Sequence, residues 1–283
     1  MIIINELKNS MPVARISGTA GIPTSFIYYN RSEHPGKGKT RVSEEIETEI
    51  VKIASNRTTY GYRRIWAMLR NKDMKVNVKT VRRIMRKNGL ALPFAMHKNR
   101  TRRMDLTNPD AQNRLWETDI DYVSTARDGM VYLMSIKDCF SKAWISYELS
   151  RSCMVKDCIE AMEKAYAIRE PDGKSMSLIL RTDNGPQYIA GEFRDSMKIL
   201  GTGQEYVQKQ APEDNGDIES FHNSLKTDYI WVTDIEVLED AQKLMEYTFN
   251  NYNTIRPHSS IDYLAPEALK EAGMRARNSG KSS

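Results

Sequence analysis

The stretch Thr182-Asp183-Asn184-Gly185-Pro186-Gln187-Tyr188 decides the fold of this chain. It follows the apolar run Ser177–Leu180, which has the length and composition of a buried strand. Asn-Gly and Gly-Pro pairs favour turns and would end that strand sharply. The sequence therefore predicts that Asp183 stands at the carboxyl end of a strand, where its carboxylate can point into a cleft instead of a core.

Two further acidic residues are positioned to meet Asp183. Asp119 lies in a second strand-like run, residues 115–123, and Glu219 lies near the start of a predicted helix, with 35 residues between it and Asp183. Helical spacing places Glu219 on the polar face of that helix, because the opposite, buried face takes the apolar residues Ile218, Phe221, Leu225 and Tyr229. The pattern predicts three carboxylates around one cleft.

Three carboxylates that converge on one point repel one another unless a cation neutralises them. Mg²⁺ and Mn²⁺ are hard cations that take oxygen ligands. Two such ions about 3.5–4 Å apart can activate an attacking oxygen and stabilise a leaving oxygen in phosphodiester displacement. We therefore expect two Mg²⁺ or Mn²⁺ ions, held by Asp119, Asp183 and Glu219.

Three short words carry a resemblance to a known family: Trp116-Glu117-Thr118-Asp119, Asp183-Asn184-Gly185-Pro186-Gln187 and Glu219-Ser220-Phe221. Their order and spacing resemble the acidic triad of the retroviral-integrase superfamily. The words themselves resemble the OrfB catalytic subunit of insertion-sequence transposases of the IS-three family. This resemblance implies a ribonuclease-H-like core in which Asp119, Asp183 and Glu219 are the catalytic, metal-binding residues of a DDE transposase.

Some positions depart from the pattern of that family. Arg181-Thr182 precedes Asp183 where His-Ser is more usual, and Asp121 stands where Thr is usual. Neither change removes a predicted metal ligand. Asp121 lies on the same side of its predicted strand as Asp119, so it is a backup carboxylate for the site.

The composition limits the class of protein. A chain of 283 residues is long enough for two or three domains. No apolar run approaches the roughly 18 residues of a membrane span. The three cysteines form no paired framework, which suits a reducing compartment. These features predict a soluble cytoplasmic protein, associated with the nucleoid and without a membrane partner.

The net charge of +5 is unevenly distributed. Residues 1–111 hold 22 Lys and Arg against 9 Asp and Glu, whereas the remainder holds 20 against 28. A basic amino-terminal part joined to an acidic remainder indicates a nucleic-acid-binding region. The alternative is a set of well-solvated surface helices.

Two stretches of the amino-terminal part have helix-turn-helix patterns. The pattern of residues 1–30 predicts a small element with two short helices around Gly21. The pattern of residues 42–90 predicts a DNA-binding domain with three helices, over 44–54, 60–69 and 78–87. The last helix has an apolar stripe and a basic face, whose side chains suit phosphate contacts: Lys79, Arg82, Arg83, Arg86 and Lys87. A solvated charged face is the alternative.

Other basic residues are also candidates for DNA binding. Arg63 and Arg64 lie in a word, Tyr60–Ile65, that resembles the domain preceding the core in the same transposases. Lys226 resembles a basic residue that these proteins keep two helical turns beyond the last acid, where it could hold a DNA phosphate. Arg256 either contacts DNA or ties the last helix to the sheet. The basic linker 91–114 could track DNA or act as a tether.

The core, residues 115–272, alternates strands and helices. Strands are predicted over 115–124, 130–137, 143–149, 177–180 and 205–208, and helices over 154–169, 192–200 and 214–229. Three strands in a meander, followed by alternating helices and strands, indicate an α/β fold with a mixed sheet. The resemblance makes this a ribonuclease-H-like core preceded by a helical helix-turn-helix region. Residues 273–283 predict a disordered tail.

The sequence thus predicts a DDE transposase, a metal-dependent polynucleotidyl transferase that cleaves DNA and transfers strands of an insertion sequence. Its expected partners are double-stranded DNA, further copies of the chain on DNA, and an upstream-frame protein of the OrfA type. Two alternatives stay open. One is a catalytically silent, transposase-derived DNA-binding regulator, and the other is a ribonuclease-H-type nuclease.

Overall fold

The computed structural model describes residues 11–21, 23–24, 42–93, 106–169, 177–207 and 215–269. The chain divides into two compact units, residues 1–47 and 48–283. Three sequence predictions lie wholly or mostly outside the described residues: the second helix of the 1–30 element, the 91–114 linker and the 273–283 tail.

Helix α2 (Val13–Ala20) is the described part of the small amino-terminal element. It ends at Gly21, whose φ of 64° lies in the left-handed region. A residue without a Cβ atom adopts this conformation freely, and it is the common way to end a helix. The first predicted helix and its glycine stop are confirmed.

Three helices follow, as predicted: α4 (Glu44–Asn56), α5 (Tyr62–Arg70) and α6 (Val78–Lys87). Each buries an apolar stripe, represented by Ile50, Ile65 and Val81. The Asn77 side chain caps α6, because its Oδ1 accepts a hydrogen bond of 2.8 Å from the Lys79 amide. The five cations predicted for the basic face of α6 are all exposed.

Among the described residues, five strands form one mixed sheet in the order β3-β2-β1-β4-β5. β1 (Leu115–Thr125), β2 (Gly129–Asp138) and β3 (Trp144–Ser150) form an antiparallel meander, and β4 (Ile179–Thr182) and β5 (Gly203–Tyr206) add parallel strands on the other side of β1. β5 begins two residues before the predicted 205. Its position depends on pairing with β4, which the local pattern does not encode.

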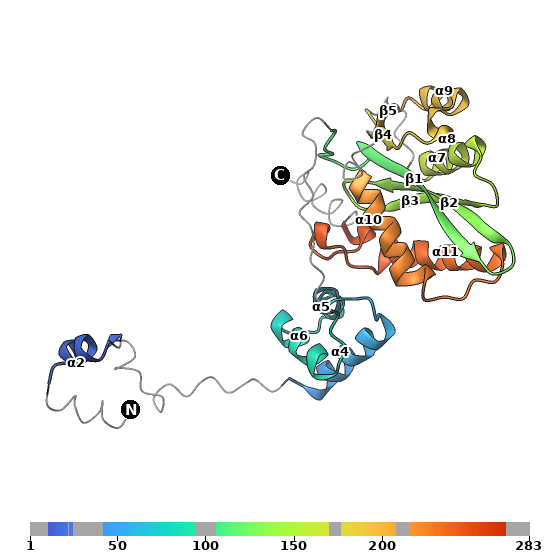
Figure 1. The fold of residues 1–283 in the computed structure, drawn as a ribbon. Coiled ribbons are helices and arrows are strands. Elements are labelled where there is room, and N and C mark those ends of the chain that lie inside the picture. The colour runs from blue at the N-terminus through green and yellow to red at the C-terminus, as the bar shows by residue number, and fades with distance from the viewer. Residues whose placement is uncertain are drawn as a thin grey trace, which may run out of the picture. The chain divides into compact units, whose positions relative to one another are not determined.

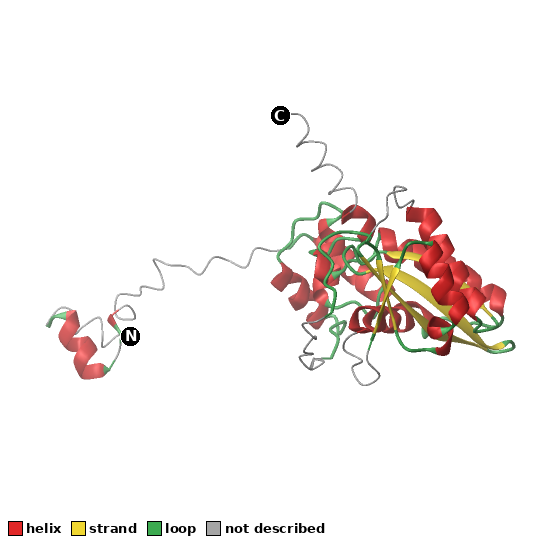
Figure 2. Ribbon diagram, turned by 90° about the horizontal axis from the view of Figure 1, so that it is seen from above, coloured by secondary structure: helices red, strands yellow, loops and turns green. Residues whose placement is uncertain are grey.

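Helices cover both faces of the sheet (Figures 1 and 2). One face packs against α7 (Val155–Arg169), α8 (Pro186–Ile189) and α9 (Gly191–Ile199) around the buried Trp116. The other face packs against α10 (Gly216–Leu225) and α11 (Leu238–Thr254) around Trp144 and Phe221. A π-helical turn, Lys226–Ile230, continues α10. The sequence predicted α10 and its buried face but not α11.

Side chains of β1 alternate between these two faces. Trp116 belongs to the core on the α7 side, whereas Val123 belongs to the core under α10 and α11. The odd-numbered residues of β1, which include Glu117, Asp119 and Asp121, therefore face α10. None of the described helices is long and apolar enough to cross a membrane.

Candidate active site

A row of alternating charges crosses the sheet next to the predicted triad. Strand register pairs Lys137 of β2 with Glu117 of β1, Glu117 with Arg181 of β4, and Arg181 with Glu205 of β5. Arg181 donates from Nη1 to Glu117 at 2.9 Å and from Nε to Glu205 at 2.7 Å. The four charges cancel, which allows Arg181 and Glu117 to be buried almost completely, at 0% and 1% exposure.

The next row along the same face carries two of the predicted triad carboxylates. Asp119 and Asp183 each follow a member of the charge row by two residues, so both side chains stay on the α10 face, about 6.6 Å further along their strands. Ser135 of β2 is the neighbour of Asp119 on its other side. The parallel register of β1 and β4 thus brings Asp119 and Asp183 together.

Helix α10 lies along β1, in contact with successive residues of the α10 face. The Ile218 amide donates to Glu117 Oε2 at 2.9 Å, and His222 Nδ1 lies 3.5 Å from Asp119 Oδ2. This spacing is regular because four helical residues and two strand residues both advance by about 6–7 Å. Glu219 lies between Ile218 and His222 on α10, so its backbone is held beside Asp119.

The turn after β4 is built by the residues of the Asp-Asn-Gly-Pro-Gln word. Asn184 Nδ2 donates to the Val207 carbonyl, and Pro186 occupies the first turn of α8. The Gly185 amide donates to Asp183 Oδ1 at 2.9 Å. An added Cβ atom at Gly185 would lie 2.9 Å from the same oxygen, so the residue at this position must be glycine for the carboxylate to keep its place.

The environment of Asp183 favours a nearby cation. Burial raises the pKa of this carboxyl, the Gly185 amide opposes that rise, and the negative charge of Asp119 adds to it. A raised pKa means that the ionised form is less stable here than in water. A divalent cation bound to these oxygens would remove that penalty, so the residues present fit a hard metal ion.

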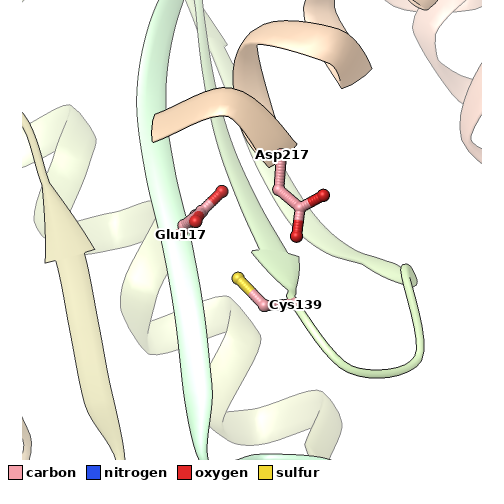
Figure 3. Close-up of side chains that lie close together, drawn as sticks. All are labelled: Glu117, Cys139 and Asp217. Carbon is pink, nitrogen blue, oxygen red and sulfur yellow. The ribbon is translucent and has the colours of Figure 1, made fainter. Parts of the chain in front are cut away.

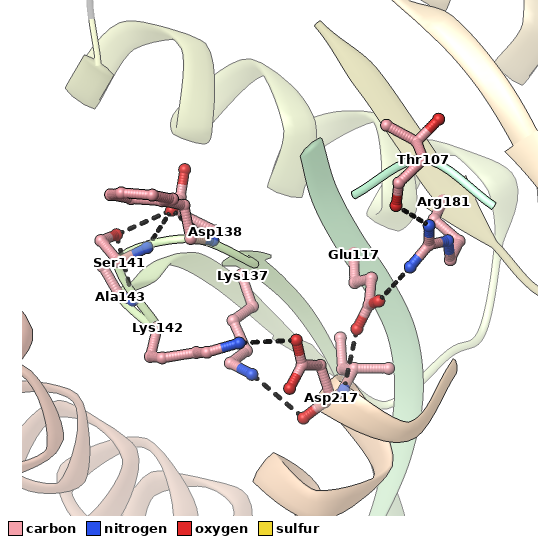
Figure 4. Close-up of polar contacts among 11 residues, drawn as sticks. Thr107, Glu117, Lys137, Asp138, Ser141, Lys142, Ala143, Arg181 and Asp217 are labelled. Carbon is pink, nitrogen blue, oxygen red and sulfur yellow. Dashed lines mark hydrogen bonds and ion pairs between the residues drawn. The ribbon is translucent and has the colours of Figure 1, made fainter. Parts of the chain in front are cut away.

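A second group of potential ligands lies at the amino-terminal end of α10, where Glu117, Cys139 and Asp217 bring ligand atoms within 4.8 Å of one another (Figure 3). Protein cations already hold both carboxylates. Glu117 is bound to Arg181, and Asp217 is bound to Lys142 at 2.7 Å (Figure 4).

The thiol of this group is also a poor ligand. Burial, followed by the charge of Glu117, raises the pKa of Cys139 well above its ordinary value. Metal binding requires the thiolate. The group is therefore an ion-pair network, and it does not fit a metal.

Two residues beyond Asp119 on the same face, Asp121 binds Lys226. Lys226 Nζ lies 2.5 Å from Asp121 Oδ1, and the second oxygen of Asp121 is buried without a hydrogen-bond partner among the described residues. The predicted DNA-binding lysine and the predicted backup carboxylate thus neutralise each other. The Lys226 side chain remains 29% exposed.

The remaining predicted DNA-binding residues fall into two groups. Arg63 is exposed, as are the basic residues of α6. Arg64 and Arg256 instead converge on Asp228, with contacts of 3.8 and 3.0 Å. Arg256 is 3% exposed, and it ties the end of α11 to Asp228 of the π-helical turn instead of to the sheet.

Sequence reasoning missed the residues that support the triad. His222, which periodicity alone did not single out, is buried against Asp119. Arg181 was noted only as a departure from a family pattern. A signal for it was present, because Glu117 and Arg181 each precede a triad aspartate by two residues, and strand alternation puts such residues on one face.

Comparison with protein families gives matches over most of the described chain. An HTH-like domain matches residues 42–98. Integrase core domain families match residues 109–212 and residues 200–266. The second and third matches together span the whole sheet and the helices that carry the site.

Curated relatives align over most of the chain. A transposase for insertion sequence element IS904 of Lactococcus lactis is 28% identical over 257 residues, covering 84% of this chain and 98% of the relative. A putative transposase, InsK, for insertion sequence element IS150 of Escherichia coli is 24% identical over 283 residues, covering 94% of this chain and 96% of the relative.

Solved structures give more distant likenesses. The simian T-cell lymphotropic virus intasome is 16% identical, with a TM-score of 0.49 over 78% of this chain and 73% of that chain. The HTLV-2 integrase catalytic core in complex with magnesium is also 16% identical, with a TM-score of 0.45 over 57% of this chain and 98% of that chain.

Proposed function

The chain belongs to the insertion-sequence transposases with an integrase core, which are DDE-type polynucleotidyl transferases, and we propose that Asp119, Asp183 and Glu219 are its catalytic carboxylates. The strand register carries this proposal. It pairs Glu117 with Arg181, and it thereby brings together the aspartates that stand two residues further along β1 and β4. The contacts of α10 with β1 support Glu219 as the third member.

The site requires divalent metal, and we propose that the ions are two Mg²⁺ or Mn²⁺. Carboxylate oxygens from Asp119, Asp183 and Glu219 would hold them. Bound there, the ions supply Lewis-acid stabilisation of the attacking and leaving oxygens of a phosphodiester. The raised pKa of Asp183, which burial and the charge of Asp119 cause, supports metal binding at the triad.

The reaction proposed is cleavage at the element ends followed by joining of the 3′-hydroxyl to another strand. Water or the 3′-oxygen is the nucleophile, so no serine or tyrosine of the chain forms a covalent bond to DNA. The carboxylates of Asp119, Asp183 and Glu219 would fix the reaction centre. The Gly185 amide holds Asp183 by a hydrogen bond, and the His222 ring packs 3.5 Å from Asp119.

The chain binds DNA through its helix-turn-helix region, and we assign the contacts to the exposed cations of α6 and to Arg63. Lys226 would bind a phosphate near the triad. An ammonium group has three N–H donors, so Lys226 can keep Asp121 and still donate to a phosphate oxygen. We further propose that copies of the chain assemble on two DNA ends and that an OrfA-type protein is a partner. The proposed location is the cytoplasm, in association with the nucleoid.

Strand transfer tests the assignment. The donor DNA would be the sequence that flanks the gene in its own genome, assayed in Mg²⁺ and in Mn²⁺ with wild type, D119N, D183N and E219Q. A matched control is D195N, because Asp195 is an exposed carboxylate of α9 that forms an ion pair with Lys198 on the same helix. Wild type and D195N should join DNA, whereas the three triad variants should bind DNA without joining it.

The outcomes also separate the alternatives. Joining by D183N at the wild-type rate would refute the triad. If wild type binds DNA but joins nothing, even with the upstream-frame protein added, the chain is a DNA-binding regulator. Cleavage of RNA–DNA hybrids in preference to duplex DNA would indicate a ribonuclease-H-type nuclease.

A further inference from the structure

A small polar pocket lies beside α10, next to the residues Asp217, Ser220 and Ser224 of this helix. Its volume is about 100 Å³, and it is enclosed by α10, the loop after α11, the turn between β2 and β3, and α5. Its walls carry four cations and one carboxylate: Arg64, Lys137, Lys142, Arg256 and Asp217. The pocket is separate from the acidic triad, whose residues do not line it.

The carboxylates near the pocket do not balance its cations. Asp217 pairs with Lys142 at 2.7 Å, and its backbone carbonyl accepts from Lys137 Nζ at 3.0 Å (Figure 4). Asp228, behind the wall, holds both Arg64 and Arg256. With Lys137 assigned to the neutral charge row through Glu117, three wall cations still face two carboxylates.

One donor of the wall is buried without a partner. Arg256 is 3% exposed, and its Nη2 has no hydrogen bond to any described residue. Its guanidinium carbon lies 5.5 Å from the centre of the Tyr252 ring, its Nε donates to Asp228, and its Nη1 meets His258. An unpaired guanidinium N–H in a buried site costs free energy unless an acceptor reaches it.

The electrostatics of the neighbouring histidine agree with an excess of positive charge. Burial, together with the charges of Arg256 and Lys137, lowers the pKa of His258 to about 2. The imidazole is therefore neutral, and its Nδ1 accepts from Arg256. The histidine therefore adds no positive charge to the pocket wall.

We infer that this pocket binds a phosphate oxyanion, supplied by the DNA backbone. A tetrahedral oxyanion can accept from Arg256 Nη2 and from the ammonium groups of Lys137 and Lys142. A volume of about 100 Å³ admits a phosphate group. The inference rests on the proposed function, because that function brings DNA to the core.

The pocket would then anchor DNA beside the helix that carries Glu219. Ser220 and Ser224 of α10 line the pocket, and Ser220 is the residue after Glu219. A phosphate bound there would fix the register of the duplex relative to α10 without touching the reacting atoms. Phosphate contacts of this kind position DNA and carry no base information.

Two binding measurements on the full-length chain test this. The first is calorimetric titration with inorganic phosphate at constant ionic strength. The second is binding of a duplex from the element end between 50 and 200 mM salt. The variants are K142Q, which removes one wall cation, and S224E, which places a carboxylate in the pocket. The control is K164Q, because Lys164 is an ion-paired lysine of α7 outside the pocket.

The expected result is weaker binding of inorganic phosphate by K142Q and none by S224E, with K164Q unchanged. Each lost phosphate contact reduces the salt slope by about 0.9. The fourfold rise in salt should therefore weaken duplex binding by wild type about 3.5-fold more than duplex binding by K142Q. Equal unfolding midpoints for the variants would show that the fold is intact.

Unchanged phosphate binding and an unchanged salt slope in both variants would overturn the site. Weaker binding of inorganic phosphate with an unchanged salt slope of duplex binding would show that the phosphate does not come from DNA. It would assign the pocket to a free phosphate. Neither readout requires catalysis. A wild-type chain that joins no DNA would refute the proposed function and leave this test valid.

Discussion

Replacing Arg181 with methionine tests whether the charge row holds the candidate site together. The guanidinium makes three contacts, to Glu117 at 2.9 Å, to Glu205 at 2.7 Å and to the Thr107 carbonyl at 2.7 Å. Methionine fills much of the same volume but makes none of them. Glu117 would stay buried with its charge uncompensated by Arg181.

The size of the effect follows from burial. Removing one partner of a buried ion pair typically costs 3–5 kcal/mol, because the other charge stays desolvated. Glu117 keeps the hydrogen bond from the Ile218 amide, and Glu205 is 20% exposed and can be hydrated. We therefore expect the lower end of the range, a loss of about 3 kcal/mol in the free energy of unfolding.

The assay is urea unfolding of the full chain in a double-mutant cycle of R181M and E117Q. Because E117Q removes the buried charge, the double variant should recover at least about 1.5 kcal/mol of the loss. The control is R127M, which breaks an ion pair with Glu236 whose partners are 74% and 55% exposed, and which should cost under about 1 kcal/mol.

A second readout links the charge row to the site. If the row positions the triad, R181M should weaken Mn²⁺ binding, measured by paramagnetic resonance under conditions where the variant is folded. A cost for R181M no larger than that of R127M, or strictly additive effects of R181M and E117Q, would refute the reasoning.

Three further predictions follow from single contacts. G185A should reduce Mn²⁺ affinity and strand transfer with less than about 1 kcal/mol change in stability. The new Cβ would lie 2.9 Å from Asp183 Oδ1 and would push the carboxylate out of its place, so unchanged Mn²⁺ affinity would contradict this. D228N should lower the free energy of unfolding by about 3 kcal/mol, since it leaves Arg256 buried without a counter-charge; a loss below about 1 kcal/mol in denaturant would disprove that role. His258 has a folded pKa of about 2 against an ordinary 6.5, so its contribution to stability is complete above pH 6.5 and is lost as the pH falls. Wild type should thus lose about 2 kcal/mol more than H258N between pH 7 and pH 5, and parallel pH profiles would exclude the effect.

The helices and strands could largely be read from local pattern. The three helices of residues 44–87 have apolar stripes at helical spacing, and the structure places them within two residues of the predicted bounds. The alternation in β1 also placed Asp119 and Asp121 on one side, as their shared contact with α10 confirms. The 238–254 helix was not predicted.

The contacts around the triad could not be read in this way. Lys226 suggested a free DNA contact, but it binds Asp121, and a buried His222 lies beside Asp119. Each contact joins a residue of β1 to a residue about a hundred positions later in the chain. Periodicity reports which side a residue faces, and it contains no information on what the opposing element brings to that side.

By itself, the sequence of this protein determined the acidic residues, the face on which each lies and the turn that ends β4, because these depend on backbone preferences within a few residues. The tertiary structure alone decided the register of β1 against β4, which sets Glu117 beside Arg181 from 64 positions away. It also decided that four cations from separate elements enclose one pocket. Both result from packing distant segments together, which brings charges from separate parts of the chain to one place.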